Sequence, residues 1–250
     1  MSDSAGQPWE GRQFEHRSAP DDDGSAPVAL AVALEQFRAG GIGEAGVVDV
    51  IRDSRLLIPL VSRLAEAGIG EHGPTADKSA ELSIVTVTGP DGRNVMPVFG
   101  SVEAMQRWNP LARPVPADAV RIALAAASEG TELVVLDPTS STEFVIRRPA
   151  LWAIAQSQPW IPSYLDARIF DEFRASIDDE PAVASVSLEP GDADARLAGP
   201  ELLVNLALTP GLARADLDAL LVRLQARWTS SEPIAARVDS LTVRLGEAGA

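Results

Sequence analysis

The chain has 250 residues, contains no cysteine and carries a formal net charge of −15 from 21 basic and 36 acidic residues. The absence of cysteine excludes disulfides, thiolate metal sites and cysteine nucleophiles, and the spread of acidic charge argues against binding to nucleic acid or anionic membranes. The longest apolar runs, at 28–34 and 56–61, are far shorter than the ~20 residues that span a bilayer. With no signal peptide at the start of the sequence, these features predict a soluble cytoplasmic protein.

Residues 1–27 are rich in Gly, Ser, Pro and Asp. Such a segment buries too little apolar area to offset the entropy of ordering, so it is predicted to be a disordered, mobile acidic tail. Trp9 and Phe14 are its apolar exceptions, and they are candidates for docking the tail onto the body of the protein.

Hydrophobic periodicity and turn residues predict a first domain over residues 28–160. Its predicted helices are 28–39, 44–53, 101–108, 116–128 and one opening at Pro149, and its predicted strands are 55–61, 82–88, 94–99, 133–136 and 144–146. The segment Gly89-Pro90-Asp91-Gly92 predicts a hairpin turn, because Pro fixes φ and Gly accepts positive φ. Pro59, inside its strand, indicates a sheet edge or a bulge.

A second domain is predicted over residues 165–246, after the boundary sequence Pro-Trp-Ile-Pro. Its predicted helices are 165–177 and 212–228, and its predicted strands are 183–188, 202–208 and 238–245. A hairpin followed by a helix thus recurs three times along the chain. This order predicts an α+β fold with two modules of mainly antiparallel β-sheet and helices packed on one face.

No catalytic, cofactor or metal site is predicted. A Ser-His-Asp triad needs a histidine base, and the chain has only His16 in the tail and His72 in a glycine-flanked loop. Nucleophile-elbow and phosphate-loop signatures are absent from the sequence. The acidic runs 21–23 and 178–180 lack the alternating spacing of a calcium loop and are interpreted as solvated turns.

Lys78 is the only lysine in a chain that otherwise uses arginine, and it lies between Asp77 and Glu81. A compact ammonium group is not interchangeable with a planar guanidinium. Asp77, Lys78, Glu81 and Arg93 are therefore a candidate interaction patch near the hairpin. The alternative is a structural ion pair at the start of a strand.

The tryptophans divide into two groups. Trp108 and Trp152 follow helical apolar stripes and are predicted to be core residues. Trp160 stands between two prolines and is a candidate for a contact between the domains or within a homodimer.

Several motifs occur in a consistent order: RLLIPLV at 55–61, DKSAEL at 77–82, GPDGR at 89–93, MPVFGSVEAMQRW at 96–108, ARPVP at 112–116, TELVVLDP at 131–138 and RRPALWAIA at 147–155. Together they make residues 28–157 similar to the N-terminal domain of the SseB family, named for enhanced serine sensitivity. The tail elements GRQF and DDDGSAP resemble those of actinobacterial members. The resemblance implies no catalytic residue, cofactor or substrate.

The sequence therefore predicts a non-catalytic, cytoplasmic SseB-like protein, not an enzyme, that acts through an unidentified protein partner. The alternative is a small-molecule-binding protein or metabolic enzyme with a pocket between the two modules. A cleft lined by Lys78, Arg93 or Arg113 would favour that alternative.

Overall fold

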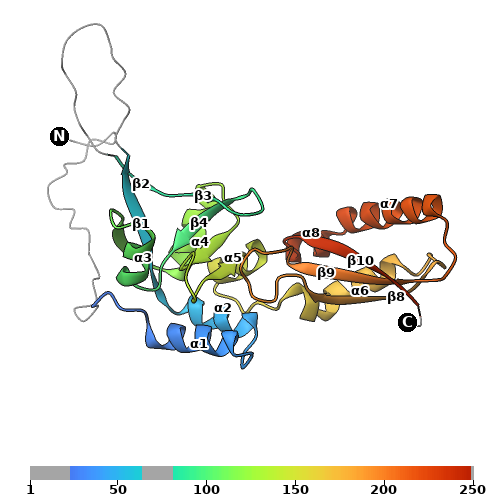
Figure 1. The fold of residues 1–250 in the computed structure, drawn as a ribbon, viewed down its shortest axis with the longest axis horizontal. Coiled ribbons are helices and arrows are strands. Elements are labelled where there is room, and N and C mark those ends of the chain that lie inside the picture. The colour runs from blue at the N-terminus through green and yellow to red at the C-terminus, as the bar shows by residue number, and fades with distance from the viewer. Residues whose placement is uncertain (1–22, 64–80, 249–250) are drawn as a thin grey trace, which may run out of the picture.

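The computed structural model describes residues 23–63 and 81–248, which form two modules lying end to end (Figure 1). The helices are α1 (Val28–Arg38), α2 (Glu44–Arg52), α3 (Val102–Trp108), α4 (Ala119–Ser128), α5 (Arg148–Ala155), α6 (Ala167–Ser176), α7 (Arg214–Ser230) and α8 (Glu232–Arg237), with a 3₁₀ turn η1 (Ser163–Leu165). The strands are β1 (Arg55–Arg63), β2 (Glu81–Ile84), β3 (Val87–Thr88), β4 (Asn94–Val98), β5 (Arg113–Asp118), β6 (Val134–Leu136), β7 (Phe144–Ile146), β8 (Val183–Pro190), β9 (Leu202–Leu208) and β10 (Leu241–Glu247). The predicted α+β fold is confirmed.

The first module holds two sheets, in the strand orders β2-β1-β5 and β3-β4-β6-β7. All their strand pairs are antiparallel except β4 with β6. A single bridge between Leu57 and Phe99 joins the two sheets. The predicted turn at 89–92 connects β3 to β4: the N–H of Gly92 donates to the carbonyl of Gly89 at 3.0 Å, and Gly92 has φ +82°.

Strand β1 is buried on both faces, as its uninterrupted apolar sequence predicts. Leu56 and Ile58 belong to the main core of the module, which is covered by α1, α2, α4 and α5. Leu57 points the other way, because side chains alternate along a strand. It packs with Phe99 and Met105 in a smaller cluster beside α3.

Pro59 lies in the central strand of its sheet, so the predicted edge position is wrong. Pro59 is opposite Pro114 of β5. On its other side, β1 changes partner between the bridge at Leu57 and the β2 pairing that begins at Leu60. Proline is tolerated here because this change of partner leaves no ladder hydrogen bond that needs its missing N–H.

Other boundaries also differ from the prediction. The predicted strand 82–88 is divided between β2 and β3, which belong to different sheets. The predicted helix 116–128 begins at Ala119, where the Asp118 side chain accepts a hydrogen bond from the N–H of Arg121 at 2.8 Å. Residues 113–118 form β5 instead, and the two prolines in that strand concealed it.

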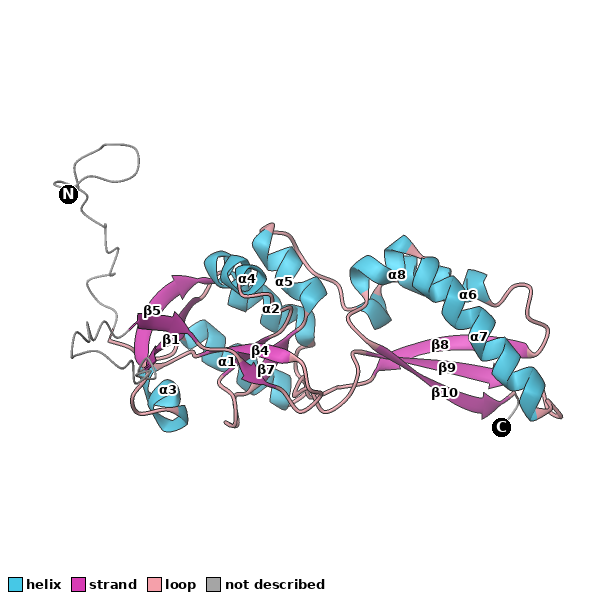
Figure 2. Cartoon of the chain, turned by 90° about the horizontal axis from the view of Figure 1, so that it is seen from above, coloured by secondary structure: helices cyan, strands magenta, loops and turns pink. Residues whose placement is uncertain are grey.

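In the second module, α6, α7 and α8 cover one face of the sheet β10-β9-β8 (Figure 2). Strand β9 pairs antiparallel with β8 and parallel with β10. The alternating residues Leu202, Val204, Leu206 and Leu208 face a helix-borne cluster that includes Phe173 and Trp228. The sequence missed α8, and the final strand begins at Leu241 rather than at 238.

The three tryptophans considered from the sequence, out of five in the chain, occupy different environments. Trp108 packs against Phe99 with ring centroids 5.4 Å apart, consistent with the prediction. Trp152 is 49% exposed, so its predicted core position is wrong: α5 buries Leu151 and Ile154 on its inner face. Trp160 packs, partly buried, against the main core of the first module.

Most of the predicted acidic tail lies outside the described residues. Its last residues contact the body of the protein: the carbonyl of Gly24 accepts from the N–H of Val102 at 2.9 Å, and the carbonyl of Ser25 accepts from Arg55 at 2.8 Å. These contacts place Gly24 and Ser25 against α3 and β1.

Candidate functional site

Residues 191–200, which connect β8 to β9, fold back against the first module, and we call this segment the clasp. The N–H of Val145 in β7 donates to the carbonyl of Ala195 at 2.8 Å. The guanidinium of Arg38 donates to the carbonyl of Asp194 at 2.6 Å. The backbone of the clasp therefore covers the edge strand of the four-stranded sheet.

The clasp also fills an apolar seat on the first module. Leu197 is buried in a cluster whose other buried members are Val95, Leu133, Val135 and Val145. Gly89 lies directly beside it: a Cβ atom at Gly89 would be 2.9 Å from Cδ2 of Leu197. Gly89 therefore does more than begin the hairpin turn, because the absence of a side chain there also makes room for the clasp.

Arg147, the residue before α5, connects the modules from a position that is only 5% exposed. Its guanidinium lies 2.7 Å from Asp192 and 3.1 Å from Asp239. It also donates to the carbonyl of Gly199 at 2.8 Å. A buried guanidinium is tolerated only when it is paired and hydrogen-bonded, and here the second module supplies every one of these partners.

Asp192 shapes the clasp. Its carboxylate accepts hydrogen bonds from the backbone N–H groups of Arg196, Leu197 and Ala198 at 3.2, 2.8 and 3.4 Å. Within the clasp, Ala195 and Leu197 have φ of 48° and 58°, a left-handed conformation that L residues adopt at a cost. The side chain of Asp192 holds this strained backbone in place.

Arg93 adds a second connection between the modules. Its two terminal nitrogens each lie 3.0 Å from an oxygen of Asp239, a bidentate pair, and its Nε lies 2.6 Å from Asp91. Burial alone would raise the pKa of Asp239, but the hydrogen bond and charge of Arg93, with the charge of Arg147, outweigh it and leave that pKa lowered. Asp239 is therefore an ionised structural partner.

We call the contact between the modules around Arg93, Arg147 and Asp239 the junction. Glu44 of α2 and Tyr164 of η1 also lie between the modules, where the tyrosine hydroxyl donates to the Glu44 carboxylate at 3.2 Å. Burial, with the nearby charge of Glu201, raises the pKa of Glu44 to about 7. Burial likewise raises the pKa of Glu201, whose carboxylate accepts from Ser163 at 2.7 Å. The junction holds more carboxylates than arginines, and burial disfavours the ionised form of two of them, Glu44 and Glu201.

A family model described as the SseB protein N-terminal domain matches residues 30–153. The chain belongs to the SseB family. No curated protein and no solved structure matches it. The matched segment contains Arg93 and Arg147 of the junction, whereas Asp192, Glu201 and Asp239 come from the part of the chain beyond it.

A pocket of about 590 Å³ opens beside the junction. Its first-module wall is the hairpin turn with Pro90 and Arg93, and its other wall is formed by residues 197–200 of the clasp with Asp239 and Ser240. The lining combines apolar side chains with a few polar groups, as ligand pockets do.

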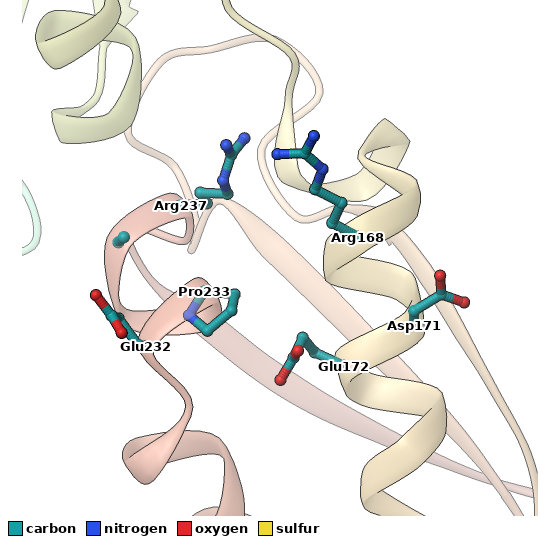
Figure 3. A pocket seen from close by; sticks show the side chains of 7 residues that line it. Arg168, Asp171, Glu172, Glu232, Pro233 and Arg237 are labelled. Carbon is teal, nitrogen blue, oxygen red and sulfur yellow. The ribbon is translucent and has the colours of Figure 1, made fainter.

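A second pocket, of about 510 Å³, lies between α6 and α8 (Figure 3). The side chains of Arg168 and Arg237 lie at one end of it, and Glu172 and Glu232 lie toward the other (Figure 3). Arg237 is already paired with Asp166 at 2.9 Å. Most of the residues that line this pocket are charged and exposed to solvent, whereas Pro90, Leu197 and Pro200 line the junction pocket.

The predicted patch of Asp77, Lys78, Glu81 and Arg93 is only partly within the described residues. Asp77 and Lys78 lie outside them, and for Glu81 the backbone alone is described, at the start of β2. Arg93 is described and belongs to the module junction. Arg113 lies exposed in β5 and does not line the junction pocket.

Other sequence interpretations bear on chemistry. His16 and His72 lie outside the described residues. Within residues 23–63 and 81–248, no cluster of His, Asp and Glu is arranged to hold a metal ion, and no helix is both long and apolar enough to cross a membrane. Glu180 is 5% exposed and pairs with Arg223 at 2.6 Å, so its interpretation as part of a solvated turn is wrong.

Replacing Glu44 should change how stability depends on pH. Because the pKa of Glu44 is raised from 4.5 to about 7 on folding, its contribution is fully present below about pH 4.5 and is lost as pH rises through about 7. Between about pH 5 and about pH 8, the wild type should lose on the order of 2 kcal/mol more stability than Glu44→Gln. Chemical denaturation at several pH values measures this, with Glu129→Gln on the surface as the control. Parallel profiles for wild type and Glu44→Gln would contradict it.

The contact between the hairpin and the clasp should appear as coupling between two substitutions. Glycine 89 replaced by alanine forces Leu197 to move, so Gly89→Ala should destabilise the chain by about 1–3 kcal/mol. In a Leu197→Ala background the same change should cost less, giving a coupling energy of about 0.5 kcal/mol or more. Gly92→Ala is the matched control. A Cβ atom at Gly92 would meet no other atom, and the positive φ of this residue alone should lower the free energy of unfolding by about 1 kcal/mol, whether or not Leu197 is present. Additive effects of Gly89→Ala and Leu197→Ala would show that the clasp is not seated there.

Proposed function

We propose that this SseB-family chain is a non-catalytic cytoplasmic protein that acts by binding another protein. The observation that carries the proposal is the contrast between the junction and the surface of the first module. At the junction, Arg93, Arg147 and Asp239 are committed to structural pairs. Glu44, the junction carboxyl whose pKa is raised to about 7, accepts a hydrogen bond from Tyr164 between the modules and lines neither of the two larger pockets.

The surface of the first module, by contrast, presents large apolar side chains. Trp152 on α5 is half exposed, and Leu124 on α4 is 58% exposed. The guanidinium of Arg148 lies over the Trp152 ring, 5.4 Å from its centroid. Residues of α4 and α5, including Ala127, Leu151 and Trp152, line a groove of about 330 Å³. Exposed tryptophan beside arginine is the composition typical of binding hot spots.

Capture experiments with matched variants test this function. Purified full-length chain used as bait should retain a specific partner. Trp152→Ala should reduce the retained amount at least ~10-fold, because loss of a hot-spot tryptophan weakens binding by about 2 kcal/mol or more. Phe170→Ala removes a similarly exposed aromatic side chain from α6 in the second module and serves as the control.

Both variants should stay folded with similar, small losses of stability, because each side chain is about half buried. Equal recovery of every partner by wild type and Trp152→Ala would remove the α4–α5 surface from the proposal. Conversion of many small-molecule substrates by each molecule of the purified chain would overturn the non-catalytic assignment itself.

A second candidate function is small-molecule binding in the junction pocket, which the presence of Arg93 in its wall favours. A specific ligand stabilises the folded state by mass action. Screening metabolites for a rise in unfolding temperature should then give hits that disappear in Ala198→Phe, which fills the pocket from the exposed side of the clasp. Ala193→Phe, elsewhere in the clasp and also exposed, is the control. Hits that persist in Ala198→Phe would place the ligand elsewhere.

A further inference from the structure

The contacts of the clasp identify the side chains that the surface beneath it can bind. We call this surface the seat; it consists of the apolar cluster around Val145, with Arg38 and Arg147 beside it. Strand β7 is an edge strand, and the carbonyl of Ala195 accepts a hydrogen bond from the N–H of Val145, which would otherwise have no strand partner on that side. Asp192, three residues earlier, reaches the buried Arg147. Leu197, two residues later, fills the apolar cluster. The seat thus recognises an acidic, a small and an aliphatic residue at fixed spacing.

The fit of the clasp to this seat is imperfect. Ala195 and Leu197 both adopt left-handed backbone conformations to reach it. The Nε of Arg38 is buried without a hydrogen-bond partner among the described residues. Burial and the like charge of Arg196 in the clasp lower the pKa of Arg38. A ligand with an acidic residue at the position of Arg196 would replace this repulsion with attraction.

From these contacts we propose that the seat of the clasp is a binding site for an acidic peptide of a partner protein, which the clasp occupies in cis. The proposal rests on the proposed function, protein binding, but it uses a different surface from the α4–α5 groove. The partner segment carries Asp, a small residue and Leu at the spacing of Asp192, Ala195 and Leu197, with Asp or Glu in place of Arg196.

Competition between the two occupants has a defined direction. A tethered segment acts at an effective concentration of about millimolar, so the clasp excludes weak ligands from the wild-type seat. Loosening the clasp without changing the seat should therefore expose the site. Asp192→Ala does this, because it removes the acceptor of three clasp N–H groups and one partner of Arg147. A peptide that brings its own Asp can restore the pair with Arg147.

Three synthetic peptides test the proposal on the full chain: the clasp sequence GDADARLAGP, its acidic version GDADAELAGP, and GNADAELAGP, in which the first Asp is Asn. Fluorescence anisotropy should show the acidic version binding Asp192→Ala at least ~10-fold more tightly than wild type. It should also raise the unfolding temperature of Asp192→Ala. The clasp sequence should bind more weakly than its acidic version, and the Asn version should bind more weakly still.

Leu197→Ala provides an independent opened variant if Asp192→Ala does not fold, and Arg38→Gln in either background should reduce the preference for the acidic version. Absence of binding to both opened variants, or equal binding of the Asp and Asn peptides, would overturn the proposal. The failure of this proposal is separable from that of the proposed function, because partner capture that depends on Trp152 would survive it.

Discussion

The buried guanidinium of Arg147 is the interaction on which the arrangement of the two modules depends. It comes from the first module, and its carboxylate partners, Asp192 and Asp239, come from the second. Removal of either carboxylate would take away one of the two ion pairs of a buried guanidinium, which is more costly than loss of an exposed pair. Arg93 and the clasp reinforce the same geometry, because each contacts a group that Arg147 already holds.

The same junction also holds groups in unfavourable states. The arginines require carboxylates to neutralise them, yet the junction contains further carboxylates, Glu44 and Glu201, that burial keeps from ionising freely. The clasp reaches Arg147 through residues with left-handed backbone conformations. Strain of this kind persists only where surrounding contacts compensate for it, and here Asp192 provides them.

Local patterns were sufficient to predict much of the fold and little of the site. The leucine stripe of α7, the turn at 89–92 and the alternation in β9 are each set by neighbours in the sequence, so they were found. Strand β5 was missed because its prolines contradict strand propensity, and Trp152 was misplaced because a short helix leaves its stripe ambiguous. The partners of Arg147 lie 45 and 92 residues away and look like ordinary surface acids in the sequence. No local signal distinguishes them, whereas Arg93 was selected for its position near the hairpin.

The protonation of Glu44 has a consequence for how the modules come together. Near neutral pH this carboxyl is ionised in the unfolded chain and about half protonated in the folded one. Closing the junction must therefore take a fraction of a proton from the solvent. The heat of that step would depend on the ionisation enthalpy of the buffer, so joining the two modules is also a small proton-uptake reaction.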